Sequence, residues 1–222
     1  MLYRHLIKID RQNILRCRFF ALSSVLCLSA CSIFEPIKTP PMHYFTLAAK
    51  ASDWDYCPQH RRHMPTILVN QARPNAVYNS ARMIYIPACY QIQYFTQNRW
   101  TDPPAQMLQP LLINALQHTD RFQAIINTPS TTYYDWILNT QLLSFQQEFI
   151  SIPSRFRIAI RAQLINARTR RVISSEDFLV TQIAPHDDAY GGALAANQAT
   201  QKILNEISCF CLSNLTSLKL NH

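Results

Sequence analysis

The segment RFRIAIRAQLIN, residues Arg155–Asn166, alternates apolar and polar side chains along its length. On an extended backbone, one face would carry Phe156, Ile158, Ile160, Ala162 and Leu164. The opposite face would carry Arg155, Arg157, Arg161 and Gln163. Because side chains in a strand alternate with a period of two, the segment predicts a β-strand with one covered face and one solvated face.

Two further long segments, one on each side of this strand, also predict strands. Asp135–Phe149 precedes it, and Val172–Ile183 follows it after a turn at Arg168–Arg171. Three long strands joined by short connections predict an antiparallel meander. Shorter strands are predicted elsewhere, at Tyr44–Leu47, Thr66–Val69, Arg82–Ile86, Gln91–Phe95 and Phe122–Ile126.

Two amphipathic segments predict the helices that cover this sheet. The first spans about 102–119, with Asp102 as the N-cap and Pro103 at the first helical position. The second spans about 187–212, and the only two glycines of the chain, Gly191 and Gly192, fall in its first turn. The sequence therefore predicts an α+β fold, with an antiparallel or mixed sheet covered by two main helices.

The first 30 residues have the pattern of a cleaved N-terminal signal peptide. A basic leader precedes Phe19–Leu28, which is too short to cross a bilayer as a permanent helix, since a crossing takes about 20 residues. The next residues, LSAC ending at Cys31, resemble the lipobox of bacterial lipoproteins, so lipidation is predicted on Cys31. The alternatives are an ordinary cleaved signal and an N-terminal anchor helix, and both also export the domain.

Cleavage before Cys31 divides the chain into a signal peptide (1–30), a proline-rich tether (31–42), one domain (43–216) and a tail (217–222). The signal peptide holds five of the 21 basic residues and one of the 13 acidic residues, so 16 and 12 remain. The net charge then falls from +8 to +4, and the argument for a nucleic-acid partner weakens.

Four cysteines remain after Cys31: Cys57, Cys89, Cys209 and Cys211. Cys209 and Cys211 are too close in sequence to pair without strain, so a Cys57–Cys89 disulfide is favoured, and thiols buried in a helix are the alternative for the other two. Cys57, His60 and His63 have the spacing of metal ligands, but Arg61 and Arg62 would repel a cation. We expect this loop to be solvated, with no metal site.

No catalytic motif supports an enzyme. Two adjacent glycines inside a helix cannot form a phosphate-binding loop, and neither a Gly-x-Ser-x-Gly nor a His-Glu-x-x-His motif occurs. An unrecognised hydrolase would need an acid and a base drawn from Asp135, Glu148, Glu176 and Asp177, which more simply end strands in solvent. We therefore expect neither catalysis nor a cofactor.

Two features could contact a partner or lipid headgroups. Arg155, Arg157 and Arg161 would form a basic patch on one strand face, although a solvated sheet face explains them equally well. Trp100 precedes the first helix, where it could be an exposed contact or, as is more common, could pack beneath the helix.

Several segments together resemble one family. They are His43–Leu47 after the lipobox, Arg82–Tyr85, Tyr90–Pro104 with its NRWTDPP motif, and Ala195–Ala199. In this order they are similar to the ABC-type transport auxiliary lipoproteins, and the match covers most of the mature chain. The polar insert at Asp53–Pro65 departs from the family pattern and places any family surface near that loop in doubt.

The resemblance implies a non-catalytic accessory lipoprotein of a lipid transport system between the inner and outer membranes. Its partners would be an ABC transporter subunit or a protein with a mammalian-cell-entry domain, and phospholipid is a further candidate; a homo-oligomer stays open. Ser32 after Cys31 is compatible with the periplasmic face of the outer membrane, since retention at the inner membrane commonly uses Asp there. The alternative is a structural lipoprotein of another envelope assembly or secretion machine.

Overall fold

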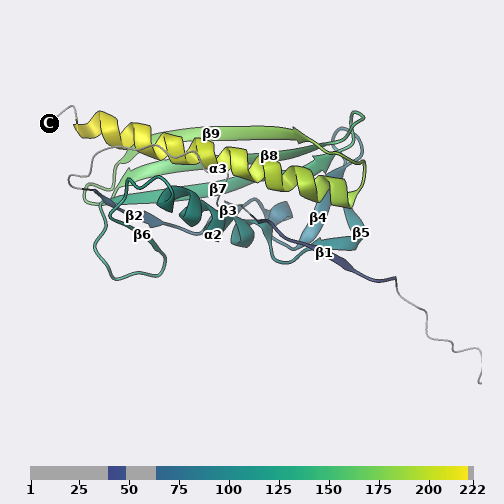
Figure 1. Cartoon of the computed structure of the whole chain (residues 1–222), viewed down its shortest axis with the longest axis horizontal. Coiled ribbons are helices and arrows are strands. Elements are labelled where there is room, and N and C mark those ends of the chain that lie inside the picture. The colour runs from purple at the N-terminus through teal and green to yellow at the C-terminus, as the bar shows by residue number, and fades with distance from the viewer. Residues whose placement is uncertain (1–39, 49–63, 220–222) are drawn as a thin grey trace, which may run out of the picture. The chain divides into compact units, whose positions relative to one another are not determined.

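The computed structural model describes residues 40–48 and 64–219 of the chain. The meander predicted from the sequence is confirmed: β7 (Trp136–Glu148), β8 (Arg155–Asn166) and β9 (Val172–Ile183) are antiparallel neighbours (Figure 1). In β8, all five residues of the predicted inward face are buried, and Ile158, Ala162 and Leu164 are fully so. The alternation of RFRIAIRAQLIN therefore marks the two faces of the sheet.

The other strands add mainly parallel pairs, which make the sheet mixed. They are β1 (His43–Phe45), β2 (Thr66–Val69), β3 (Arg73–Pro74), β4 (Arg82–Ile86), β5 (Gln93–Trp100) and β6 (Ala124–Asn127). The long strand β7 lies at the centre, because β2, β3 and β4 pair with one of its edges in parallel and β8 pairs with the other. A short 3-10 helix, η3 (Ala76–Tyr78), follows β3.

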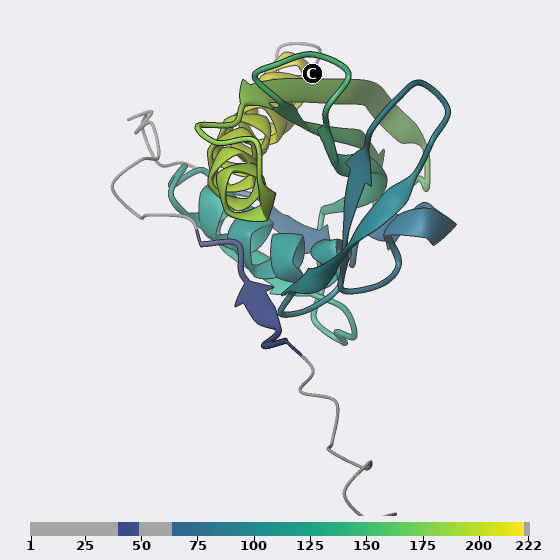
Figure 2. The same cartoon turned by 90° about the vertical axis from the view of Figure 1, so that its right-hand side faces the viewer.

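Two helices cover the inner face of the sheet. α2 (Pro104–Gln117) packs against β6 and against α3 (Ala189–Lys219), and α3 lies along β8 and β9 (Figures 1 and 2). The prediction of an α+β fold with two covering helices is confirmed. α3 extends further at its carboxyl end than the predicted 187–212.

The predicted cap of α2 is wrong. The N-cap residue is Pro103, with φ −52° and ψ 135° and no side-chain cap bond, so Asp102 lies outside the helix. Pro104 explains the shift, because a residue that precedes a proline is disfavoured from the helical region. At α3, in contrast, Asp188 Oδ1 accepts a hydrogen bond of 2.6 Å from the amide of Gly191, which caps the helix.

Strand ends account for the other differences from the predictions. The predicted strand Tyr44–Leu47 is β1 at His43–Phe45, Gln91–Phe95 is the longer β5, and Phe122–Ile126 is shifted to β6. Each of these strands pairs in parallel with a segment distant in sequence, so its bounds depend on the partner more than on local alternation.

An inner aromatic trio, formed by Trp100, Phe145 and Phe156, fills the space between the sheet and the helices. The ring centroids lie 5.3 Å apart for Trp100–Phe145 and 4.8 Å apart for Phe145–Phe156. All three side chains are 2% exposed. This trio joins β5, β7 and β8 into one core.

Both glycines stand where α3 approaches the rest of the domain. A Cβ on Gly191 would lie 2.1 Å from the carbonyl oxygen of His186, and one on Gly192 would lie 2.1 Å from Oε1 of Gln147 in β7. Both distances are far below van der Waals contact, so the first turn of α3 requires residues without side chains.

Asn197 of α3 holds the segment that leads out of β1. Its Oδ1 accepts a hydrogen bond of 2.7 Å from the amide of Ala48, and its Nδ2 donates one of 3.2 Å to the carbonyl of Thr46. Asn197 lies in the Ala195–Ala199 segment, and these bonds give it a structural role there.

Candidate functional site

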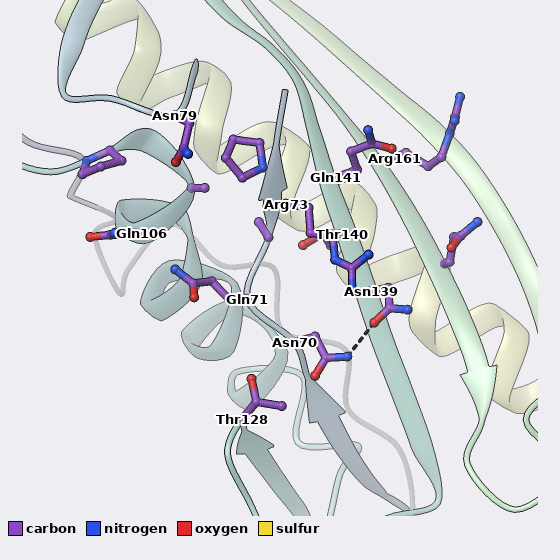
Figure 3. A pocket seen from close by; sticks show the side chains of 15 residues that line it. Asn70, Gln71, Arg73, Asn79, Gln106, Thr128, Asn139, Thr140, Gln141 and Arg161 are labelled. Carbon is purple, nitrogen blue, oxygen red and sulfur yellow. Dashed lines mark hydrogen bonds between the residues drawn. The ribbon is translucent and has the colours of Figure 1, made fainter. Parts of the chain in front are cut away.

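A polar groove of about 750 Å³ lies beside the solvated face of the meander (Figure 3). Its walls come from the segment after β2, from β3, from the start of α2, and from β7 and β8. β3 is placed there by its pairing with β7, in which Arg73 lies opposite Gln141. The groove is therefore assembled from segments spread over nearly one hundred positions.

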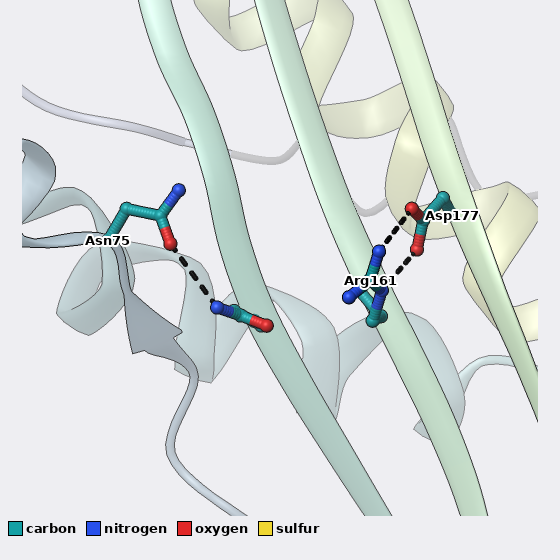
Figure 4. A network of polar contacts seen from close by, with 4 residues as sticks. Asn75, Arg161 and Asp177 are labelled. Carbon is teal, nitrogen blue, oxygen red and sulfur yellow. Dashed lines mark hydrogen bonds and ion pairs between the residues drawn. The ribbon is translucent and has the colours of Figure 1, made fainter.

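Carboxamide side chains dominate the lining of this groove. They are Asn70, Gln71, Asn79, Gln106, Asn139, Gln141 and Gln163. Asn70 Nδ2 donates a hydrogen bond of 2.7 Å to Asn139 Oδ1 (Figure 3), and Gln141 Nε2 donates one of 3.2 Å to Asn75 Oδ1 (Figure 4). Each carboxamide has two donors and one acceptor oxygen, so these pairs leave capacity for a ligand.

The only charged side chains among the lining residues are Arg73 and Arg161. Arg161 donates from Nε and Nη2 to the two carboxylate oxygens of Asp177, at 2.6 and 2.7 Å (Figure 4). This hydrogen-bonded pair raises the pKa of Arg161 and lowers the pKa of Asp177. Within the described residues Arg73 makes no such ion pair, so it supplies the net positive charge of the groove.

This lining suits a ligand with hydroxyl or phosphate oxygens. Carboxamides and guanidinium groups donate hydrogen bonds to such oxygens, and an arginine adds charge for a phosphate. The apolar lining is limited to alanines and prolines, namely Ala72, Pro74, Pro103 and Ala105. The groove therefore suits a headgroup rather than an acyl chain.

The structure separates the three predicted arginines. All three lie on the face of β8 opposite to its buried side chains, but only Arg161 reaches the polar groove. Arg155 is opposite Glu148 of β7, and Arg157 is opposite Gln146, which accepts a hydrogen bond of 2.5 Å from Tyr78 Oη. Burial, and then the nearby charge of Glu148, raise the pKa of Tyr78.

The other predicted site residues divide between the core and undescribed segments. Trp100 is buried in the inner aromatic trio, in agreement with its packing role. Cys89 is exposed, while Cys57 and Cys31 lie outside the described residues, so the disulfide and the lipidation stay predictions. Cys211 is buried in α3, and this burial raises the pKa of its thiol to about 12.

The carboxylates considered for a hydrolase do not gather in one place. Asp135 directly precedes β7, and Glu148 is its last residue. Asp177 of β9 pairs with Arg161 of β8. Asp135 accepts a hydrogen bond of 2.8 Å from the amide of Thr66. Across residues 40–48 and 64–219, no three His, Cys, Asp or Glu side chains lie close enough to hold a metal ion. Cys57, His60 and His63 are outside these ranges.

Sequence reasoning placed Arg161 and Gln163 on the solvated face of β8 but missed the groove that they line. Its carboxamides come from five separate segments, and no spacing along the chain links them. One local signal was present, because Asn139 and Gln141 interrupt the apolar run of β7 at alternate positions.

Among the described helices, none combines the length and the apolar character required to span a bilayer. No curated protein matches this chain. A protein of the DUF330 family from Xanthomonas campestris has a similar fold, with a TM-score of 0.67 and 18% identity over 81% of this chain and 97% of its own. An uncharacterized protein also shares the fold, with a TM-score of 0.61 and 13% identity over 78% and 99% of the two chains.

The family model described as the ABC-type transport auxiliary lipoprotein component matches residues 46–208. The match extends from the segment after β1 through most of α3 and includes both sides of the polar groove. The chain therefore belongs to the family of ABC-type transport auxiliary lipoprotein components.

Proposed function

We propose that this protein is a non-catalytic accessory lipoprotein of an ABC-type system that moves lipids between the inner and outer membranes. The observation that carries the proposal is the family match over residues 46–208, which spans nearly all of the described domain. The polar groove supports it, because a concave surface rich in carboxamides can bind headgroups without a catalytic acid–base pair.

In this proposal, lipid on Cys31 anchors the protein at the periplasmic face of the outer membrane. Two or three acyl chains are needed for stable attachment, because a single chain gives only marginal binding. The partners are transporter subunits or a protein with a mammalian-cell-entry domain. Arg155, Arg157 and Arg161 lie on the face that would meet an acidic partner or anionic headgroups, where Asp177 balances the charge of Arg161.

Affinity purification of the full-length protein from native membranes tests this function. We expect transporter or mammalian-cell-entry subunits to co-purify, and we expect mass spectrometry to find a diacylglycerol on Cys31. Cys31→Ser is the control for anchoring. Recovery of secretion or lipopolysaccharide-assembly proteins instead would favour the alternative envelope machine, and an intact Met1 without acylation would refute the anchor.

A charge-reversal pair tests the basic face. Arg157→Glu together with Arg161→Glu should weaken binding to vesicles with anionic lipid or to the co-purified partner, most strongly at low salt. The matched control is Arg170→Glu with Arg171→Glu in the turn between β8 and β9, which changes the charge equally. Equal binding by the two double variants would assign the arginines of β8 to an ordinary solvated face.

A further inference from the structure

Two loops lie side by side at one end of the sheet. Residues 87–92 join β4 to β5, and residues 149–154 join β7 to β8. Their bases are connected, because the amide of Phe149 donates a hydrogen bond of 2.8 Å to the carbonyl of Ile86. We call these two segments the apolar loops.

An outer aromatic trio of Tyr85, Phe95 and Phe149 supports the apolar loops. The ring centroids lie 4.7 Å apart for Tyr85–Phe95 and 5.7 Å apart for Tyr85–Phe149. All three side chains are half-buried. Both loops therefore stand on one packed base, which fixes them relative to each other.

The tips of the apolar loops expose large hydrophobic side chains. Tyr90 is fully exposed, Ile152 is 85% exposed, and about half of Ile92 and of Ile150 is exposed. Neither loop contains an Asp, Glu, Lys or Arg. Single exposed hydrophobic residues are common, but four on two adjacent uncharged loops mark an interaction surface.

The backbone at Tyr90 adds an independent argument. Its φ of 66° lies in the left-handed region, which disfavours a bulky side chain. The exposed ring makes no packing contribution that would compensate for this conformation within the described domain. The fold alone therefore does not account for a tyrosine at this position.

We propose that the apolar loops insert into the lipid surface of the membrane that holds the anchor. The first support comes from the direction of the chain. β1 is parallel to β5 with His43 opposite Asn98, so the residues before His43 leave β1 toward the end where β5 begins, which is the end with the apolar loops. The proposal rests on the proposed function for the anchor at Cys31.

The reach of the chain is compatible with this orientation. Eleven residues separate Cys31 from His43, and they can span at most about 40 Å. The register places Gln93 five positions before Asn98 on β5, a distance of about 17 Å along the strand. A lipidated Cys31 can therefore lie in a bilayer that the apolar loops touch.

The charges around the apolar loops also favour a lipid surface. Arg155 is exposed directly after the second loop, where it could meet headgroup phosphates. Glu148 lies opposite it on β7, and its Oε1 accepts a hydrogen bond of 2.8 Å from Nε2 of Gln146. The two nearest carboxylates of the β9–α3 connection turn toward the backbone, because Asp187 accepts a hydrogen bond of 2.6 Å from the amide of Ser154 and Asp188 accepts one from Gly191. Tyrosine and aliphatic side chains beside an arginine are typical of membrane interfaces.

The opposite end of the sheet has a different character. It holds the turn Arg168–Arg171, with three arginines, and the loop with Tyr133, which is 76% exposed. Asp135 and Arg168 line the same surface hollow as Tyr133. This end therefore provides a matched control, since it offers an exposed tyrosine in charged surroundings.

Two tyrosine-to-tryptophan variants test the insertion. The acylated full-length protein, carrying either Tyr90→Trp or Tyr133→Trp, is bound to vesicles of phosphatidylethanolamine and phosphatidylglycerol with brominated acyl chains. We expect the emission added by Tyr90→Trp, relative to the parent protein, to shift to shorter wavelength and to be quenched by the brominated chains. The emission added by Tyr133→Trp should not change.

A glycine variant separates a role of Tyr90 in membrane insertion from a role in folding. Tyr90→Gly removes the exposed ring and relieves the left-handed backbone, so its melting temperature should rise while docking of the loops on vesicles weakens. Docking is read from the quenching of a tryptophan introduced by Ile152→Trp, measured with and without the Tyr90→Gly substitution in otherwise identical chains.

Each outcome assigns a failure to one proposal. If Cys31 is acylated but Tyr90→Trp is no more quenched than Tyr133→Trp, loop insertion is refuted while the anchor remains. If mass spectrometry finds no acylation of Cys31 in the native protein and Tyr90→Trp is still quenched, the anchor is refuted and insertion is supported. If Tyr90→Gly abolishes recovery of a protein partner and the tryptophan introduced by Ile152→Trp is not quenched by the brominated chains, the loops bind that partner and insertion is refuted.

Discussion

The inner and outer aromatic trios are built from neighbouring strands of one sheet but differ in exposure. β5 contributes Trp100 to the inner trio and Phe95 to the outer trio, while β7 contributes Phe145 to the inner trio and is directly followed by Phe149 of the outer trio. The inner rings are 2% exposed, whereas the outer rings are half-buried. Four or five residues along each strand therefore separate the core from the surface.

The difference shows what decides the role of an aromatic residue in this domain. The inner trio lies where the sheet is covered by the helices, so its area is removed from water within the domain itself. The outer trio extends beyond this cover and supports the apolar loops. The same sheet thus provides stability where the helices cover it and a proposed contact surface where it extends beyond them.

Truncation within the inner trio should have the largest effect. Trp100→Ala leaves a cavity among fully buried rings, so we expect the free energy of unfolding to fall by about 3–5 kcal/mol. Urea denaturation followed by circular dichroism measures this change. A loss below about 1 kcal/mol would mean that the site collapses around the cavity and that the contrast between the trios is small.

Alanine substitutions at the two glycines test how much the close packing of α3, which covers the inner trio, contributes to the free energy of unfolding. Gly191→Ala and Gly192→Ala should each cost about 1–3 kcal/mol, because a Cβ would overlap with His186 or Gln147. Gly191→Ala should cost more, since its obstacle is a backbone carbonyl, whereas the amide of Gln147 can rotate. The same denaturation experiment ranks them, and the reverse order would show that the buried amide is the more rigid obstacle.

The outer trio should contribute less to stability than the inner one. Phe149→Ala removes a half-buried ring, and we expect a loss of about 1–2 kcal/mol. Hydrogen exchange at the amides of residues 87–92 should increase at the same time, because the shared base of the apolar loops is weakened. A loss equal to that of Trp100→Ala would remove the distinction between the two trios.

We expect the smallest effect from acid, which should weaken the hydrogen bond between Ser154 and Asp187 at the base of the second apolar loop. The hydrogen bond from the amide of Ser154 to Asp187 lowers the pKa of this carboxyl below its ordinary value near 4. Its contribution is therefore present above the ordinary pKa and is lost as the pH falls through the lowered pKa. Asp187→Asn should flatten this part of the curve of melting temperature against pH, with Asp102→Asn as the control at another exposed position.

The strands with clear local limits could be predicted from the sequence. β2, β4, β8 and β9 begin and end at the residues that their patterns indicate, because turns and polar residues mark their limits. β3 was missed, since Arg73–Pro74 is too short for any period and exists only through its pairing with β7. The parallel pairs were missed for the same reason, because partner choice is not encoded within a single strand.

For the functional surfaces, too, only features with a local sequence signal could be predicted. Arg161 could be placed on the solvated face of β8 from its position in the alternation. The polar groove could not be predicted, because Asn70, Gln106 and Asn139 meet only after β2, α2 and β7 are packed. The apolar loops could not be identified as a surface, because the sequence places Ile150 and Ile152 in the connection between two predicted strands and does not indicate how exposed they are.

The attachment of β1 determines how the domain would respond to mechanical load. A pull from the residues before His43 runs parallel to β1 and β5, so it shears their hydrogen bonds together instead of opening them one after another. Asn197 then passes the force from Thr46 and Ala48 to α3. Tension applied through the residues before His43 would therefore be distributed over the sheet and α3.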